Sequence, residues 1–178
     1  MIRIPRNSLV LLIGPAGCGK STFAAKHFKP TQVVSSDECR ALISDDPADQ
    51  TVSRAAFEIL HHIVELRLDL GRLTVVDATS LTAESRSPLI RMARQRGFNT
   101  VAIVFDVELS TCLERNRARR RVVPDSAVSQ QHWLLAEAAR GVHRQRFDYL
   151  FVLNEEDQDR ATVAIGRRIS RPPGPRVR

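Results

Sequence analysis

The chain has few cysteines, and they lie too far apart to form a recognisable site. Cys18, Cys39 and Cys112 are odd in number and lack metal-ligand spacing. This argues against a disulfide framework and a cysteine-based metal site, so we expect a reduced, cytoplasmic protein. Long apolar runs are also missing, since none reaches the roughly 18 residues that a bilayer span requires. The short N-terminal apolar stretch leads straight into a glycine-rich motif, so we expect no signal peptide and no membrane partner.

Lysine is scarce, although the chain is strongly basic. Its 27 basic and 20 acidic residues give a formal net charge of +7, yet the lysines are Lys20, Lys26 and Lys29 alone. A basic balance suits a polyanionic partner such as nucleic acid, but an arginine-rich genome composition explains it equally well. Aromatic residues make up 5 % of the chain, and we expect its single tryptophan, Trp133, to be buried between helices.

The most informative motif is the phosphate-binding loop (P-loop) at residues 14–21, which reads G-x-x-x-x-G-K-S. Its glycines let the backbone curl so that N–H groups point at phosphate oxygens. Lys20 supplies a cation for the β- and γ-phosphates of ATP or another nucleoside triphosphate, and the Ser21 hydroxyl suits Mg²⁺. The expected triphosphate-binding residues are Gly14, Pro15, Ala16, Gly17, Cys18, Gly19, Lys20, Ser21 and Thr22.

Apolar runs alternate with helical patterns along the chain and predict an α/β fold. Expected strands are 9–13, 32–35, 73–77, 100–105 and 149–153, and expected helices are 21–28, 53–70, 83–96, 109–121, 126–140 and 156–169. This alternation predicts a three-layer P-loop fold, in which a five-stranded parallel sheet carries helices on both faces and a helical lid. We expect one kinase domain over residues 1–170. Residues 171–178, rich in proline and arginine, are expected to be a disordered tail or a linker.

A carboxylate and a guanidinium group, those of Asp37 and Arg40, follow the second expected strand. Asp37 is placed to accept the proton of an attacking hydroxyl, and Arg40 lies three residues later, close enough to bind an acceptor phosphate or to orient Asp37. Asp37 is equally well placed to be a helix N-cap, and both roles can hold at once.

Two further groups complete the expected site. Asp77 ends the third strand, where a carboxylate commonly supports Mg²⁺ through water; a simple turn residue is the alternative. Arg115 and Arg119, four residues apart, are predicted to share one helix face as a lid over the triphosphate. A solvated helix or a nucleic-acid patch would give the same pattern, and the roles of Arg117, Arg120 and Arg121 stay open.

Five segments resemble, in order, the kinase module of bacterial polynucleotide kinase–phosphatase, an RNA-repair protein. They are residues 14–24, 35–40, 44–52, 71–79 and 112–116. The resemblance runs from about residue 8 to 153, and the segments S-S-D-x-x-R and D-Q-T-V are its most specific parts. One departure is Ser80, where the family pattern has an asparagine.

The resemblance implies ATP- and Mg²⁺-dependent phosphorylation of 5′-hydroxyl ends of RNA or DNA. By position, Asp37 would be the general base, and Arg40 would hold the phosphate of the acceptor strand. Asp77 would support the metal waters or the acceptor site, while Arg115 and Arg119 would contact the β- and γ-phosphates. The proline-rich end fits a position just before a phosphatase module, so phosphatase and ligase modules of a longer chain are possible partners.

Three functions remain open from the sequence. The first is a polynucleotide 5′-kinase, the second is a small-molecule kinase, and the third is a nucleotide-dependent switch that transfers nothing. The basic balance and Arg40 favour the first over the second, and the pairing of Asp37 with Arg40 argues against the third. The sequence does not separate RNA from DNA, identify the nucleotide donor, or decide between a monomer and a homo-oligomer.

Overall fold

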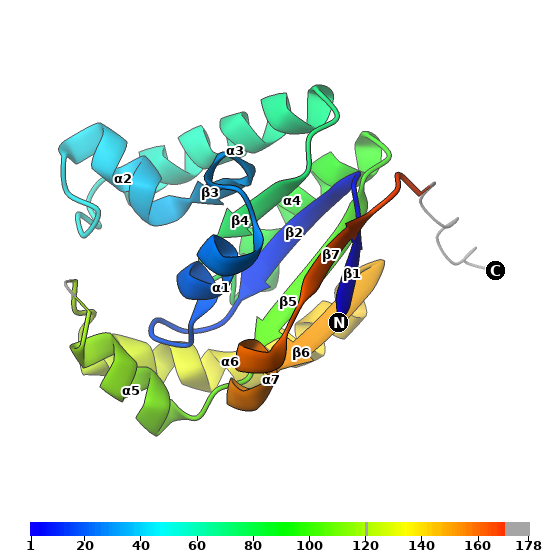
Figure 1. The fold of residues 1–178 in the computed structure, drawn as a ribbon. Helices are drawn as coiled ribbons and strands as arrows, with labels where there is room; N and C mark the ends of the chain where they lie inside the picture. The colour runs from blue at the N-terminus through cyan, green and yellow to red at the C-terminus, as the bar shows by residue number, and fades with distance from the viewer. Residues whose placement is uncertain (120, 170–178) are drawn as a thin grey trace.

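Five parallel strands form the centre of the protein in the computed structural model, which describes residues 1–119 and 121–169. The strand order is β3-β4-β2-β5-β6 (Figure 1). Their bounds are β2 Ser8–Ile13, β3 Val33–Ser35, β4 Thr74–Asp77, β5 Asn99–Phe105 and β6 Tyr149–Leu153. All five predicted strands are confirmed to within one residue at each end. The expected tail at 171–178 lies outside the described residues.

Strand β2 lies at the centre of the sheet, and its side chains are apolar on both faces. Leu9, Leu11 and Ile13 belong to the core on one face of the sheet, and Val10 and Leu12 belong to the core on the other. A strand buried on both faces is typical of a parallel sheet covered by two layers. The P-loop directly follows this strand, so it begins from a backbone that is packed on both faces.

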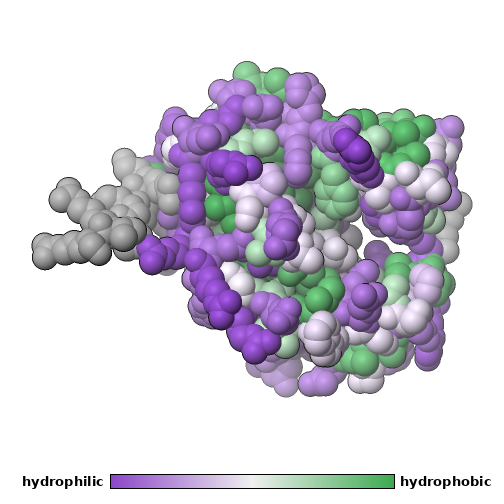
Figure 2. Space-filling view, turned by 180° about the vertical axis from the view of Figure 1, so that it is seen from behind, coloured by the Kyte–Doolittle hydropathy of each residue, from purple (hydrophilic) through white to green (hydrophobic). Residues whose placement is uncertain are grey.

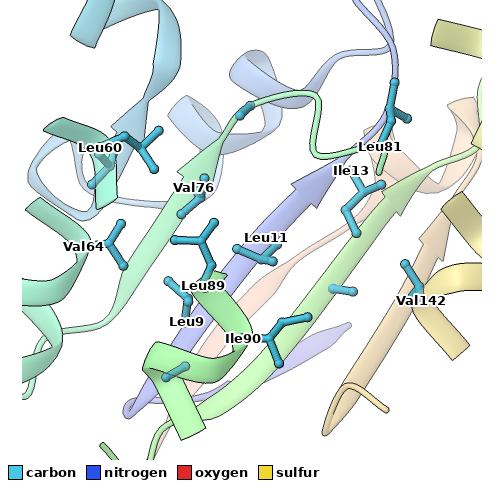
Figure 3. Packing of buried hydrophobic residues seen from close by; sticks show 14 of the residues in the cluster. Leu9, Leu11, Ile13, Leu60, Val64, Val76, Leu81, Leu89, Ile90 and Val142 are labelled. Atoms are coloured by element: carbon cyan, nitrogen blue, oxygen red, sulfur yellow. The ribbon is translucent and has the colours of Figure 1, made fainter. Parts of the chain in front are cut away.

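Three helices pack on one face of this sheet (Figure 1). They are α3 Ser53–Asp69, α4 Ala83–Gln95 and α6 Asp125–Gln145. In α3 the buried side chains, Ala56, Leu60, Val64 and Leu68, follow a four-residue spacing. Figure 3 shows how Leu60 and Val64 of α3 and Leu89 and Ile90 of α4 meet the strand side chains. Seen from behind, hydrophilic residues cover most of the surface (Figure 2).

The opposite face differs from the prediction. It carries α1 Lys20–His27 and a two-stranded parallel sheet of β1 Ile2–Pro5 and β7 Val163–Gly166. The predicted helix over 156–169 is therefore wrong beyond α7, which spans Glu155–Arg160. The β-branched Val163 and Ile165 favour an extended chain, and β7 finds its partner at the other end of the sequence.

Trp133 also departs from expectation, because its side chain is 70 % exposed. The buried face of α6 contains Leu135 and Ala138. A residue two positions before Leu135 lies about 200° around the helix from it. Within residues 1–119 and 121–169, no helix combines the length and the apolar character needed to cross a bilayer.

Candidate active site

The P-loop curls around its own lysine. Gly17 and Gly19 adopt φ values of +81° and +100°, which glycine takes without steric cost. The Lys20 Nζ donates hydrogen bonds to the carbonyl oxygens of Gly14 at 2.9 Å and Pro15 at 2.7 Å. The side chain is buried, so its ammonium group is held within the loop.

Neighbouring elements fix the position of the loop. The backbone N–H of Gly14 donates to the carbonyl oxygen of Thr79 at 3.1 Å, and the N–H of Ala16 donates to Gln131 Oε1 at 2.8 Å. Gln131 lies on α6, 115 residues from its partner, and no pattern in the sequence singled it out. The loop is thus tied to the turn after β4 and to the long helix α6.

Close packing also requires glycine in the loop. A Cβ atom at Gly17 would lie 2.1 Å from the carbonyl oxygen of Cys112, on α5 Leu109–Arg117. The Cys112 thiol below is buried, and this burial, together with the nearby Cys18, raises its pKa to about 12. The thiol is therefore protonated and unreactive at neutral pH.

A cleft of about 660 Å³ opens beside the P-loop at the carboxyl ends of the strands. The polar and charged residues that line it include Lys20, Ser21, Asp37, Arg40, Asp77, Arg119 and Arg121. They come from α1, α2 Ser36–Ser44, the end of β4 and the segment between α5 and α6. The β3–β4 register pairs Ser35 with Asp77. Asp37, two residues after Ser35, therefore lies at the same edge of the sheet as Asp77. In Figure 2 the molecule is hollowed on the side where α2 and this segment face each other.

Asp37 does not cap its helix. Ser35 is the N-cap of α2, and its Oγ accepts from the N–H groups of Asp37 at 3.2 Å and Glu38 at 3.4 Å. The N-cap interpretation of Asp37 is therefore wrong. Its carboxylate instead forms ion pairs with Arg40, on the same helix, and with Arg121, 84 residues away.

Arg40 is the more firmly held of these two partners. Its side chain is 8 % exposed, and its Nε donates to the carbonyl oxygen of Pro47 at 3.0 Å. The contact with Asp37 corresponds to the expected option that Arg40 orients this carboxylate. Arg121 was left without a role by the sequence, because nothing local distinguishes it from the neighbouring arginines.

The two expected lid arginines do not share a helix face. Helix α5 ends at Arg117, and Arg119 lies in the following turn, where its N–H donates to the carbonyl oxygen of Asn116 at 3.2 Å. The side chain of the buried Asn116 binds the backbone of Val123 twice, at 2.7 and 3.1 Å, and so fixes the course of the chain after α5. Arg119 lines the cleft, whereas Arg115 faces Gly19 and pairs with Glu155 at 3.7 Å.

Ser21 and Asp77, the two residues expected to support Mg²⁺, offer oxygen donors that fit a hard cation. Both line the cleft, and Asp77 is largely buried at the end of β4. Among the described residues, no group of three or more His, Cys, Asp or Glu side chains could hold a metal ion. Two protein oxygens suit Mg²⁺, which commonly takes its other ligands from water and substrate phosphates.

A buried arginine supports the turn that carries Thr79. Ser80 has φ +48°, in the left-handed region that asparagine adopts more readily than serine. Arg86 is 1 % exposed, and it donates from one guanidinium nitrogen to the carbonyl oxygen of Ser80 at 2.8 Å and from Nε to Gln145 Oε1 at 2.7 Å. Burial lowers the pKa of Arg86 from its usual value. No sequence motif identified this residue.

A family model described as an AAA domain matches residues 9–140, most of the chain. The chain belongs to this family. No curated protein sequence matches it.

Solved structures resemble this AAA domain in fold. A chain of the Pnkp1/Rnl/Hen1 RNA repair complex superposes with a TM-score of 0.64 at 20 % identity, over 79 % of this chain and 47 % of the other. The AAA domain thus spans about half of that longer chain. The PezAT toxin–antitoxin system of Streptococcus pneumoniae gives 0.61 at 14 % identity, over 85 % and 69 % of the two chains. A gluconokinase from Sinorhizobium meliloti gives 0.52 at 17 % identity, over 84 % and 83 %. The fold is thus that of P-loop kinases.

Proposed function

We propose that this protein transfers the γ-phosphate of ATP to the 5′-hydroxyl end of an RNA or DNA strand. The observation that carries the proposal is the position of Asp37. Its carboxylate lies in the same cleft as Lys20 and Ser21 of the P-loop. A nucleotide switch needs no carboxylate facing its triphosphate in this way, whereas phosphoryl transfer to a hydroxyl needs a group that takes the proton.

The residues divide the transfer between them. The hydroxyl oxygen of the acceptor attacks the γ-phosphorus, its proton passes to the Asp37 carboxylate, and the bond to the β,γ-bridging oxygen breaks to release ADP. Lys20 and the loop N–H groups stabilise the charge on the phosphate oxygens, and Arg119 adds a cation from across the cleft. Mg²⁺, held by Ser21 and Asp77, would neutralise charge on the β- and γ-phosphates.

Positive charge on the acceptor side supports a strand end over a small metabolite. Arg40 and Arg121 line the cleft beside Asp37, and the whole chain carries a net charge of +7. A strand offers these cations several phosphates, while most small acceptors offer none or one. The likeness to a chain of an RNA repair complex agrees with this choice. We likewise propose that the domain acts together with phosphatase and ligase modules of a longer chain. Assembly into a homo-oligomer is a further proposal.

The test is direct phosphorylation with γ-labelled ATP and Mg²⁺. The acceptors are 5′-hydroxyl RNA and DNA oligonucleotides of increasing length, a nucleoside 3′-monophosphate, and a panel of sugars and nucleosides. We expect kcat/KM to rise with strand length and to fall with added salt, because each phosphate contact releases counterions. Equal kcat/KM for the mononucleotide and the oligonucleotides at low salt would refute the strand-end assignment and favour a small-molecule kinase.

A further inference from the structure

Both oxygens of the Asp37 carboxylate are engaged in the structure. Oδ1 pairs with Arg40, and Oδ2 pairs with Arg121. A carboxylate that accepts a proton from a hydroxyl must have that hydroxyl within hydrogen-bond reach of one of its oxygens. Each carboxylate oxygen accepts two hydrogen bonds, so the acceptor hydroxyl must either share an oxygen with a guanidinium group or displace one of the two groups.

Arg121 is the partner that can leave. Its side chain is 26 % exposed, compared with 8 % for Arg40. Within residues 1–119 and 121–169, Asp37 is the one hydrogen-bond acceptor of the Arg121 side chain, whereas Arg40 also donates to the carbonyl oxygen of Pro47. Arg40 moreover shares helix α2 with Asp37, whereas Arg121 reaches Asp37 from the opposite wall of the cleft. Breaking the Arg121 contact needs only a side-chain movement.

The backbone around Arg121 is anchored on both sides. Asn116 binds the backbone of Val123 twice, and Arg117 pairs with Asp125 at the start of α6. These contacts hold the ends of the segment between α5 and α6. The backbone on both sides of Arg121 is thus held beside the cleft, so the Arg121–Asp37 pair opens by movement of the side chain.

We propose that Arg121 is a positioning residue that occupies Asp37 until the acceptor hydroxyl displaces it, and that it thereby suppresses hydrolysis of ATP by water. The inference rests on the proposed function in taking Asp37 as the base. Water that binds the free carboxylate would attack the γ-phosphorus, pass a proton to Asp37 and release ADP and phosphate. A strand end, held by many contacts, competes with Arg121 far better than a single water molecule does.

The experiment measures ATP hydrolysis without any acceptor. We expect Arg121→Ala to raise this rate about two- to fivefold, the range set by the free energy of a solvent-accessible ion pair. The matched control is Arg96→Ala, which removes an arginine–aspartate pair of similar exposure away from the cleft and should leave the rate unchanged. Arg121→Lys should give an intermediate rate, and the double variant Asp37→Asn, Arg121→Ala should lose the increase. Thermal unfolding curves identify any variant that is misfolded. If Arg121→Ala is misfolded, the hydrolysis rate of Arg121→Lys tests the proposal in its place.

An unchanged or lower rate in folded Arg121→Ala or Arg121→Lys would overturn the proposal, since it would show that Arg121 does not withhold Asp37. An equal rise of the hydrolysis rate in the Asp37→Asn background would also overturn the proposal, because the increase would then not depend on the Asp37 carboxylate. The outcome is separable from that of the proposed function. If oligonucleotides are not phosphorylated but the Asp37-dependent increase in hydrolysis is present, the acceptor class is wrong and the role of Arg121 stands.

Discussion

The close approach between the P-loop and α5 leads to a sharp prediction for Gly17→Ala. Gly17 and Gly97 both have positive φ values, +81° and +68°, so an alanine at either position carries a backbone strain of roughly 1–2 kcal/mol. No atom lies within 4 Å of a Cβ built at Gly97, so Gly97→Ala measures this strain alone. A Cβ at Gly17 would lie 2.1 Å from the Cys112 carbonyl oxygen, about 1 Å inside any comfortable contact.

The contact at Gly17 is with backbone, so either the loop or α5 must move by about 1 Å to accommodate the methyl group. A misplacement of that size costs about 10²-fold in rate when it affects a reacting group. We therefore expect Gly17→Ala to lose at least that factor in phosphoryl transfer and to bind ATP more weakly, while Gly97→Ala keeps both.

Urea unfolding of the two variants, followed by equilibrium ATP binding and turnover, separates strain from displacement. Gly97→Ala should lose roughly 1–2 kcal/mol of unfolding free energy from backbone strain, and Gly17→Ala should lose more, because its methyl group also overlaps the Cys112 carbonyl oxygen. Wild-type ATP affinity and turnover in Gly17→Ala would refute the argument that this close approach positions the loop. An equal loss of activity in Gly97→Ala would refute it as well, because the methyl group there meets nothing.

Four other predictions follow from the site. Lys20→Ala should abolish transfer, because the ammonium acts on phosphate charge, and the folded protein should show a lower urea unfolding midpoint, because the carbonyl oxygens of Gly14 and Pro15 lose their donor. Asp37→Asn should lower turnover by roughly 10²–10⁴-fold in steady-state assays, the usual range for a general base, and normal turnover would show that Asp37 is not one. Arg119→Lys should restore little of the turnover lost in Arg119→Ala, because the guanidinium fork is missing. Arg86→Met should lower the unfolding free energy by about 1–3 kcal/mol in urea titrations, since it leaves the carbonyl oxygen of Ser80 without its buried donor.

The sheet was predictable because its signals are local. Each strand is a short apolar run, and β2 and β5 are buried along their whole length, so nothing competes with the strand assignment. The P-loop was predictable for the same reason, since its glycine spacing states the backbone conformation that it needs. The second sheet was not, because β1 and β7 are four residues each and pair across almost the full length of the chain.

The charge arrangement around Asp37 shows where sequence reasoning ends. Spacing along one helix is enough to bring Arg40 to Asp37, so that contact was foreseen as one of two options. Arg121 reaches the same carboxylate only because β3 and the segment after α5 meet at one edge of the sheet. Its own neighbourhood is a run of arginines in which no position is distinguished from the next.

The P-loop itself depends on residues outside its motif. Thr79, Gln131 and Cys112 hold or confine it from three different elements, and Arg86 fixes the turn on which Thr79 lies. The motif specifies a loop that can wrap a phosphate, whereas these contacts specify where the loop stands relative to Asp37. Because phosphoryl transfer depends on the distance between donor and acceptor, substitutions at these supporting positions should change turnover more than ATP affinity. The distance between the P-loop and Asp37 thus depends on all the elements that meet at the carboxyl ends of the strands.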